Sequence, residues 1–150
     1  MLYNKKLFLF ILLLCLATIS CKKVNVHFSN IINLKNSPVS PNDEGLNSFF
    51  DLGSWMGFAL SDKESATTFS GPYILGLDHG IWVSNSFTSL DFMSENNNSI
   101  LTNLYYSEQN YFPGRLEQKL HFEGIQLLNT LIFTSDKSAI ICSKIINNGT

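Results

Sequence analysis

The chain has 150 residues, of which 45% are hydrophobic and 13% aromatic, a composition that supports a packed core and excludes a disordered segment. Its formal net charge is −2, and its 10 Lys and Arg residues are scattered. We therefore expect no nucleic-acid partner, since such a surface gathers basic residues on one face. The length fits one small domain, or part of a larger one.

Residues 1–20 have the order of parts found in a secretory signal. Lys5 and Lys6 give a short positive end, Leu7–Leu16 is apolar, and small residues lead to Cys21. The apolar run is about half the ~20 residues that a membrane-spanning helix needs. The small residues before Cys21 resemble a bacterial lipobox, in which the cysteine thiol is lipidated. The sequence therefore predicts a lipoprotein signal peptide.

Lipidation at Cys21 makes the mature protein an exported, membrane-anchored lipoprotein, in the periplasm or outer membrane of a Gram-negative bacterium. The alternative is an ordinary cleaved signal followed by an incidental cysteine. Cys142 is the one cysteine of the mature body, so an internal disulfide is excluded.

Residues 21–45 are predicted to form a tether, because Ser37-Pro38 and Ser40-Pro41 favour turns and extended backbone. A short strand is expected within it, at Val24–Phe28. Residues 46–150 are predicted to form an antiparallel, all-β sandwich domain, with short helical turns as options at 46–52 and 94–100.

Several runs of β-branched, aliphatic and aromatic residues are typical of strands. Arg115–Glu123 has the clearest pattern, because apolar and polar residues alternate along it, as in a half-buried antiparallel strand. Gln118 lies on its apolar face. Turns are expected at Tyr111–Gly114 and Ser135–Ser138. The other predicted strands are Ile81–Val83, Phe87–Phe92, Ile100–Tyr106, Ile125–Thr134 and Ala139–Ile146.

The last predicted strand is apolar on both faces, and the turn after it leads to no further strand. A complete sheet usually protects its edges. We therefore expect the sandwich to be truncated at its C-terminus, and the chain to be a piece of a longer protein.

The sequence contains no phosphate-binding loop, zinc motif or nucleophile elbow, so no cofactor or metal is expected. Asp51 and Asp78 are notable because each lies among apolar residues and glycines, where a carboxylate needs hydrogen-bond partners. Holding a loop is the main role expected for them, and catalysis is the alternative. Trp55 and Trp82 are either core residues or platforms for a sugar ring.

Three blocks, in order, resemble bacterial glucosidases of glycoside hydrolase family 63. Asn47–Gly57 is similar to the family's N-P-F-F-D-L-G-A-W-H-G, with Met56 in place of His. Gly71–Leu75 and Phe112–Leu120 resemble a Gly-Pro segment and an I-P-G-A-L-V-Q-K-L segment. The resemblance covers about residues 45–150.

This resemblance implies a β-supersandwich domain that packs on a catalytic (α/α)₆ barrel absent from this chain. The barrel hydrolyses α-glucosides with inversion, using two carboxyl groups ~6.5–9.5 Å apart. No position here matches either group, so we assign no catalytic residue, and whether the chain is itself an enzyme stays open. Sites at the sugar entrance or domain interface are expected at Asp51, Trp55, Asp78 and Arg115. The oligosaccharide substrate is expected to bind the missing catalytic domain.

Two other readings remain. A free-standing carbohydrate-binding lipoprotein would bind oligosaccharides through Trp55 or the Tyr105-Tyr106 pair. A structural lipoprotein with no ligand has only the lack of a recognisable site in its favour.

Overall fold

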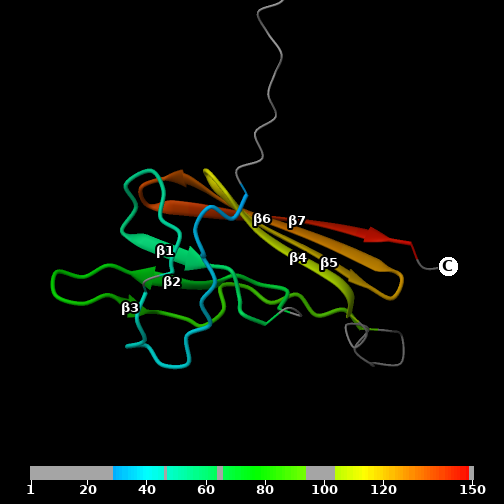
Figure 1. Ribbon diagram of the computed structural model, residues 1–150, viewed down its shortest axis with the longest axis horizontal. Coiled ribbons are helices and arrows are strands. Elements are labelled where there is room, and N and C mark those ends of the chain that lie inside the picture. The colour runs from blue at the N-terminus through cyan, green and yellow to red at the C-terminus, as the bar shows by residue number, and fades with distance from the viewer. Residues whose placement is uncertain (1–28, 46, 64–65, 94–103, 149–150) are drawn as a thin grey trace, which may run out of the picture.

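The computed structural model describes residues 29–45, 47–63, 66–93 and 104–148. They form two antiparallel sheets, which confirms the predicted all-β sandwich class. Figure 1 shows the sheets as two layers, the larger extending past the smaller. The smaller sheet contains β1 (Met56–Ala59), β2 (Ser70–Ile74) and β3 (Ile81–Trp82) in that order. The larger contains β4 (Leu104–Phe112), β5 (Arg115–Phe122), β6 (Ile125–Ser135) and β7 (Ser138–Asn147) in that order.

The larger sheet is a meander whose hairpins follow directly from the sequence. The alternation predicted for β5 is confirmed, since the four residues from Leu116 to Phe122 on one face are buried and the intervening ones are not. Gly114 and Gly124 occupy the tight turns with φ of 89° and 73°, values that L side chains rarely adopt. The turn predicted at Tyr111–Gly114 is confirmed at Pro113 and Gly114, and it is shorter than predicted because β4 continues to Phe112.

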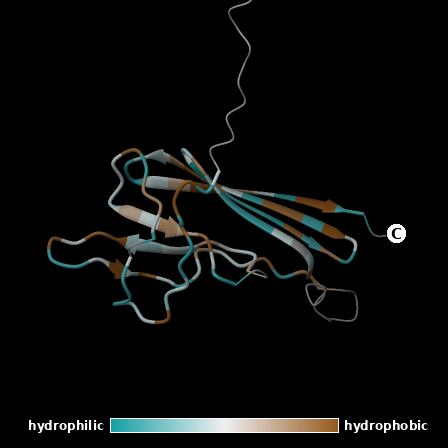
Figure 2. Ribbon diagram, viewed as in Figure 1, coloured by the Kyte–Doolittle hydropathy of each residue, from teal (hydrophilic) through white to brown (hydrophobic). Residues whose placement is uncertain are grey.

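The main core forms where the two sheets face each other. Phe58 of β1 lies with its ring centroid 5.8 Å from that of Phe133 in β6, and Phe49 lies 5.5 Å from Phe133. Leu116 and Leu131 complete the centre and are fully buried. Figure 2 shows the apolar character of β1, which supplies much of this packing.

The segment from Ser29 to Gly45 lies on the fold, which differs from the free tether expected over 21–45. Leu34 is buried in the main core at 5% exposure. Asn36 N donates to Leu60 O at 2.8 Å, and Leu60 N donates to Leu34 O at 2.8 Å. Burial of an apolar side chain and pairing of the adjacent backbone keep this segment in place. Cys21 and the strand predicted at Val24–Phe28 lie outside the described residues.

The prediction of a strand over Phe87–Phe92 is wrong, because side chains take the place of a neighbouring strand. Thr88 N donates to Thr68 Oγ1 at 3.0 Å, and Leu90 N donates to Thr67 Oγ1 at 3.2 Å. These threonine hydroxyls satisfy backbone donors that a sheet ladder would otherwise satisfy. The segment therefore stays irregular although its composition favours a strand.

Short helical turns are predicted as options at 46–52 and 94–100. The described part of 46–52 contains no helical turn. Phe49 instead pairs with Phe58 as an isolated antiparallel bridge. The second, at 94–100, lies outside the described residues. The described part of the chain also contains no helix with the length and apolar character needed to cross a bilayer.

Buried amides join the larger sheet to the loop between β1 and β2. Gln118 Nε2 donates to Thr68 O at 2.7 Å, and Asn129 Nδ2 donates to Thr67 O at 2.9 Å. Gln118 is 0% exposed and Asn129 is 1% exposed. On the neighbouring strand, Gln109 Nε2 donates to Lys63 O at 3.2 Å. These three residues share one register row on β4, β5 and β6, and together we call them the amide row.

β7 is the last strand of the larger sheet among the described residues, and its side chains are poorly covered. Ile140 is 47% exposed and Ile145 is 49% exposed, although these two residues point to opposite faces. Figure 2 colours the end of β7 near the C-terminus as hydrophobic. This strand has the apolar, open character predicted for it.

We predict that Gln118→Ala lowers the free energy of unfolding by about 2 kcal/mol, because Thr68 O loses its donor in a buried site. Chemical denaturation of the full chain measures the change. Gln126→Ala is the matched control, since Gln126 lies on the opposite face of β6. Its expected effect is within about 0.5 kcal/mol. Equal losses in the two variants would contradict a structural role for the amide row.

Candidate functional site

The turn at Asp51–Ser54 presents apolar side chains to solvent. Ser54 N donates to Asp51 O at 3.0 Å, and Leu52 and Gly53 have φ of 52° and 70°. Two successive residues with positive φ are characteristic of a type I′ turn. The Asp51 carboxylate accepts Leu52 N at 2.8 Å through Oδ1. This carboxylate therefore holds its own turn.

Leu52 pays a conformational penalty in this turn. Positive φ is unusual for a bulky residue and costs roughly 1–2 kcal/mol. Its side chain nevertheless remains 55% exposed, so burial does not offset that penalty. Trp55 follows the turn and is 62% exposed. Backbone strain at a residue whose apolar side chain is exposed is often associated with a functional surface.

The other expected site residues lie at different distances from this turn. Asp51 is near the β4–β5 hairpin, since its Oδ2 is 3.9 Å from the position that a Cβ would take at Gly114. Arg115 follows that hairpin. Trp55 O accepts Leu75 N at 2.8 Å, which places Trp55 beside the start of the β2–β3 loop. Asp78 lies farther along that loop and is exposed.

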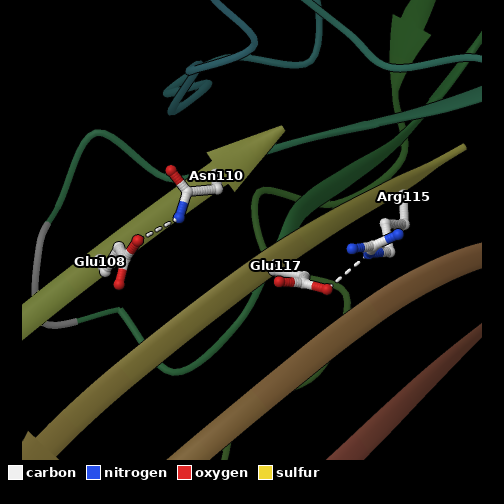
Figure 3. Close-up of polar contacts among 4 residues, drawn as sticks. All are labelled: Glu108, Asn110, Arg115 and Glu117. Atoms are coloured by element: carbon white, nitrogen blue, oxygen red, sulfur yellow. Dashed lines mark hydrogen bonds and ion pairs between the residues drawn. The ribbon is translucent and has the colours of Figure 1, made fainter. Parts of the chain in front are cut away.

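Arg115 is engaged by its own sheet. Its Nε donates to Glu117 Oε1 at 2.5 Å, and its guanidinium carbon lies 4.4 Å from the centroid of the Phe112 ring. Figure 3 shows this pair beside a second polar contact, in which Asn110 donates to Glu108. An exposed pair of this kind contributes little to stability. These contacts fix the direction of the guanidinium at the end of the sandwich.

Asp78 lines a separate open pocket of ≈ 480 Å³ with Tyr73 and His79. Its lining also includes Asp43 and Glu44. In the described ranges, His, Cys, Asp and Glu side chains form no group of three placed to hold a metal ion. The structure therefore brings Asp51 close to the β4–β5 hairpin, where Arg115 lies. Trp55 directly follows the turn that Asp51 begins. It leaves Asp78 in a different pocket.

The family comparison covers this whole region. A family model described as Glucosidase YgjK, N-terminal, matches residues 36–150. The chain belongs to this family. The match supports the part of the sequence resemblance that indicated a glucosidase N-terminal domain. It includes the strained turn, the seven strands of the described residues and most of the described segment before β1.

Sequence reasoning missed Leu52 in this YgjK N-terminal domain. Asp51-Leu52-Gly53 carries a turn signal in its Asp and Gly. The residue between them gives no sign of its conformation, because leucine rarely adopts positive φ. Leu77, which is 98% exposed in the β2–β3 loop, was also missed. A lone exposed leucine has no sequence signature.

We predict that Leu52→Asn raises the free energy of unfolding by about 1 kcal/mol, because asparagine tolerates the left-handed conformation better than leucine. Chemical denaturation of the full chain measures the gain. Leu77→Asn is the control, since Leu77 is exposed but is absent from the described residues with positive φ. Equal effects of the two substitutions would show that the gain comes from surface polarity and not from relief of strain.

Proposed function

We propose that this chain is the N-terminal, non-catalytic portion of an exported α-glucosidase-like enzyme of glycoside hydrolase family 63. Membership of the YgjK N-terminal family carries the proposal. The order of the three sequence blocks supports the narrower family. The all-β fold agrees with a supporting domain and not with a helical barrel.

In this proposal the catalytic acid and base belong to an (α/α)₆ barrel outside the chain. They lie ~6.5–9.5 Å apart, with a water molecule between the base and the anomeric carbon. The base removes a proton from that water as it attacks, and the acid protonates the leaving oxygen. The sugar is therefore released with inverted configuration. The oligosaccharide substrate binds mainly to that domain.

The role of the present domain is to support and shape the approach to the barrel. The turn that carries Leu52 and Trp55 is suited to this role, because its exposed apolar side chains are held by a fixed backbone. Arg115 gives the neighbouring hairpin a charged group of fixed direction. Asp78 lies farther away, at the rim of its own pocket.

We expect the 150-residue chain alone to release no glucose from p-nitrophenyl α-glucoside or from α-linked disaccharides. The full-length parent is expected to hydrolyse α-glucosides and to release β-glucose first, which proton NMR detects before mutarotation. Clear turnover by the isolated chain would contradict its non-catalytic role. Initial release of α-glucose by the parent would contradict inversion.

We also propose that Cys21 is lipidated and anchors the protein to a bacterial membrane. The order of charged, apolar and small residues before it supports this. Cells grown with radioactive palmitate should label the wild-type protein, and Cys21→Ser should abolish the label. Cys15→Ser is the matched control and should leave it unchanged. Label that persists in Cys21→Ser would overturn the proposed anchor.

One observation favours the alternative of a free-standing carbohydrate-binding lipoprotein. Trp55 is 62% exposed and could stack on the apolar face of a sugar ring. Trp55→Ala should then weaken the binding of maltotriose to the full chain in calorimetry. Unchanged affinity would remove Trp55 from consideration as a sugar platform.

A further inference from the structure

The outer edge of β7 presents backbone hydrogen-bonding groups that point away from the sheet. β7 is the last strand of the larger sheet in the described part of the chain (Figure 1). Asn148 N donates to Gly124 O at 2.7 Å, and continuing the β6–β7 register by one pair places these two residues opposite each other. Opposed residues in an antiparallel pair alternate between those that exchange hydrogen bonds and those whose backbone groups point outward. The backbone groups of Ile141, Ser143 and Ile145 therefore point outward.

These outward groups have no hydrogen-bond partner within the described residues. The opposite edge of the sheet is different, because Asn30 N donates to Tyr111 O at 2.8 Å on β4. Natural sheets protect open edges with prolines, bulges and charges. Over 139–147, β7 contains no proline, pairs with β6 without a bulge, and has Lys144 as its one charged residue. This edge is therefore suited to pair with another strand.

Apolar side chains flank the edge on both faces of the sheet. Ile145 is 49% exposed and shares its face with Ile141, which packs against the main core. Ile140 is 47% exposed on the opposite face, which it shares with Ile146. Covering these side chains favours association, because it removes apolar surface from water. A strand that fits here therefore carries apolar side chains on both of its own faces.

The sequence of β7 is complementary to itself about Ser143. Residues 140–146 read Ile-Ile-Cys-Ser-Lys-Ile-Ile. A two-fold axis through Ser143, normal to the sheet, places Ile141 opposite the partner's Ile145 and Ile140 opposite the partner's Ile146. Such cross-strand pairs stabilise a sheet. A two-fold interface requires a surface that matches itself, and β7 has this property.

The backbone of β7 fits the same axis. Because the backbone groups of Ser143 point outward, this residue and the partner's Ser143 can exchange hydrogen bonds across the axis. Ile141 and the partner's Ile145 can do the same, since their backbone groups also point outward. An axis one residue away in either direction pairs no isoleucine with another isoleucine. Side chains and backbone therefore favour one position of the axis.

We propose that β7 is a dimerisation edge, at which a second copy of this chain pairs in the antiparallel direction about Ser143. The 4-stranded sheets of the two copies then form one continuous sheet. The half-exposed Ile145 of each copy lies beside the partner's Ile141, at the end of the sheet that contains the main core. This proposal does not rest on the proposed function.

Sedimentation equilibrium of the full chain in detergent tests the dimer, and we expect a reversible equilibrium between monomer and dimer. Ser143→Pro removes an outward N–H from each copy but leaves the hydrogen bonds to β6 in place. It should weaken the dimer about ten-fold or more. Ser143→Ala is the matched control, because it keeps the backbone donor, and it should dimerise within about three-fold of wild type.

Ile145→Lys tests the side-chain contacts and decides the question if a thermal melt shows that Ser143→Pro does not fold. A charge at this half-exposed position should also weaken the dimer about ten-fold or more. Ile31→Lys is its control, since Ile31 is 63% exposed and lies in the segment before β1. Equal affinities of the Ile145→Lys and Ile31→Lys variants would contradict the proposed interface.

Oxidative cross-linking tests the position of the axis, in a chain with Cys15→Ser and Cys21→Ser. The axis places Lys144 opposite the partner's Cys142, in a pair without mutual hydrogen bonds whose Cα atoms lie about 4.5 Å apart. A disulfide spans that distance, so copper phenanthroline should cross-link the Lys144→Cys variant. The two Cys142 residues lie on a diagonal, about 7–8 Å apart, and should not cross-link in the background chain.

Lys119→Cys is the control for cross-linking, because Lys119 lies on the same face of the sheet but on β5. Cross-linking through Cys142 alone, at the rate of the Lys144→Cys variant, would overturn the proposed axis. A chain that stays monomeric at every soluble concentration would overturn the dimer. Slow hydrogen exchange of the outward β7 amides in such a monomer would show that another segment of the same chain covers the edge.

Discussion

The fold depends on the way in which Thr67 and Thr68 connect three parts of the chain. Their carbonyl oxygens accept the side-chain amides of Asn129 and Gln118 from the larger sheet. Their hydroxyls bind the backbone of the segment that follows β3. The hydrophobic effect holds the two sheets together without specifying direction. The buried hydrogen bonds supply that specification, because an alternative alignment leaves polar groups unpaired inside the protein.

The two ends of the sandwich differ in how completely their apolar side chains are buried. Near the main core both layers contribute large side chains, and residues such as Phe58 and Leu131 are almost fully covered. Toward the other end of the larger sheet, Leu120 and Leu127 pack with irregular segments and not with strands of the smaller sheet. β7 borders this region, and Ile145, which pairs with Leu127, remains about half exposed. The more densely packed end of the domain is therefore the end that carries the turn at Asp51–Ser54.

Local sequence pattern predicted the larger sheet well, because alternation and glycine turns are encoded within each hairpin. β5, β6 and β7 were placed within one or two residues of their observed ends. The smaller sheet was harder to predict, because its strands are short and the strands that pair with one another are separated in the sequence. The irregular course of Phe87–Phe92 depends on two threonines nearly twenty residues away. The burial of Leu34 depends on strands that follow it in the chain.

The site was predictable where residue type and backbone requirement agree. Asp51 and Gly53 mark a turn by their chemistry, but the conformation of Leu52 opposes the preference of its own side chain. The pocket between segments 38–41 and 82–85 was not predictable, because its two walls are separated by about forty residues of sequence. Neither wall has a motif of its own. The backbone hydrogen bond from Trp82 N to Pro41 O joins the two walls.

The docking of Leu34 and its neighbours onto the fold sets a limit on how far the domain can stand from a membrane. If Cys21 carries the lipid, eight residue steps separate it from Ser29, the first described residue. A fully extended chain covers at most ~3.6 Å per residue, so the gap is at most ~29 Å. That distance is comparable to the thickness of the bilayer's hydrocarbon core. If the proposed anchor holds, the N-terminal end of the described domain therefore lies within that distance of the lipidated cysteine.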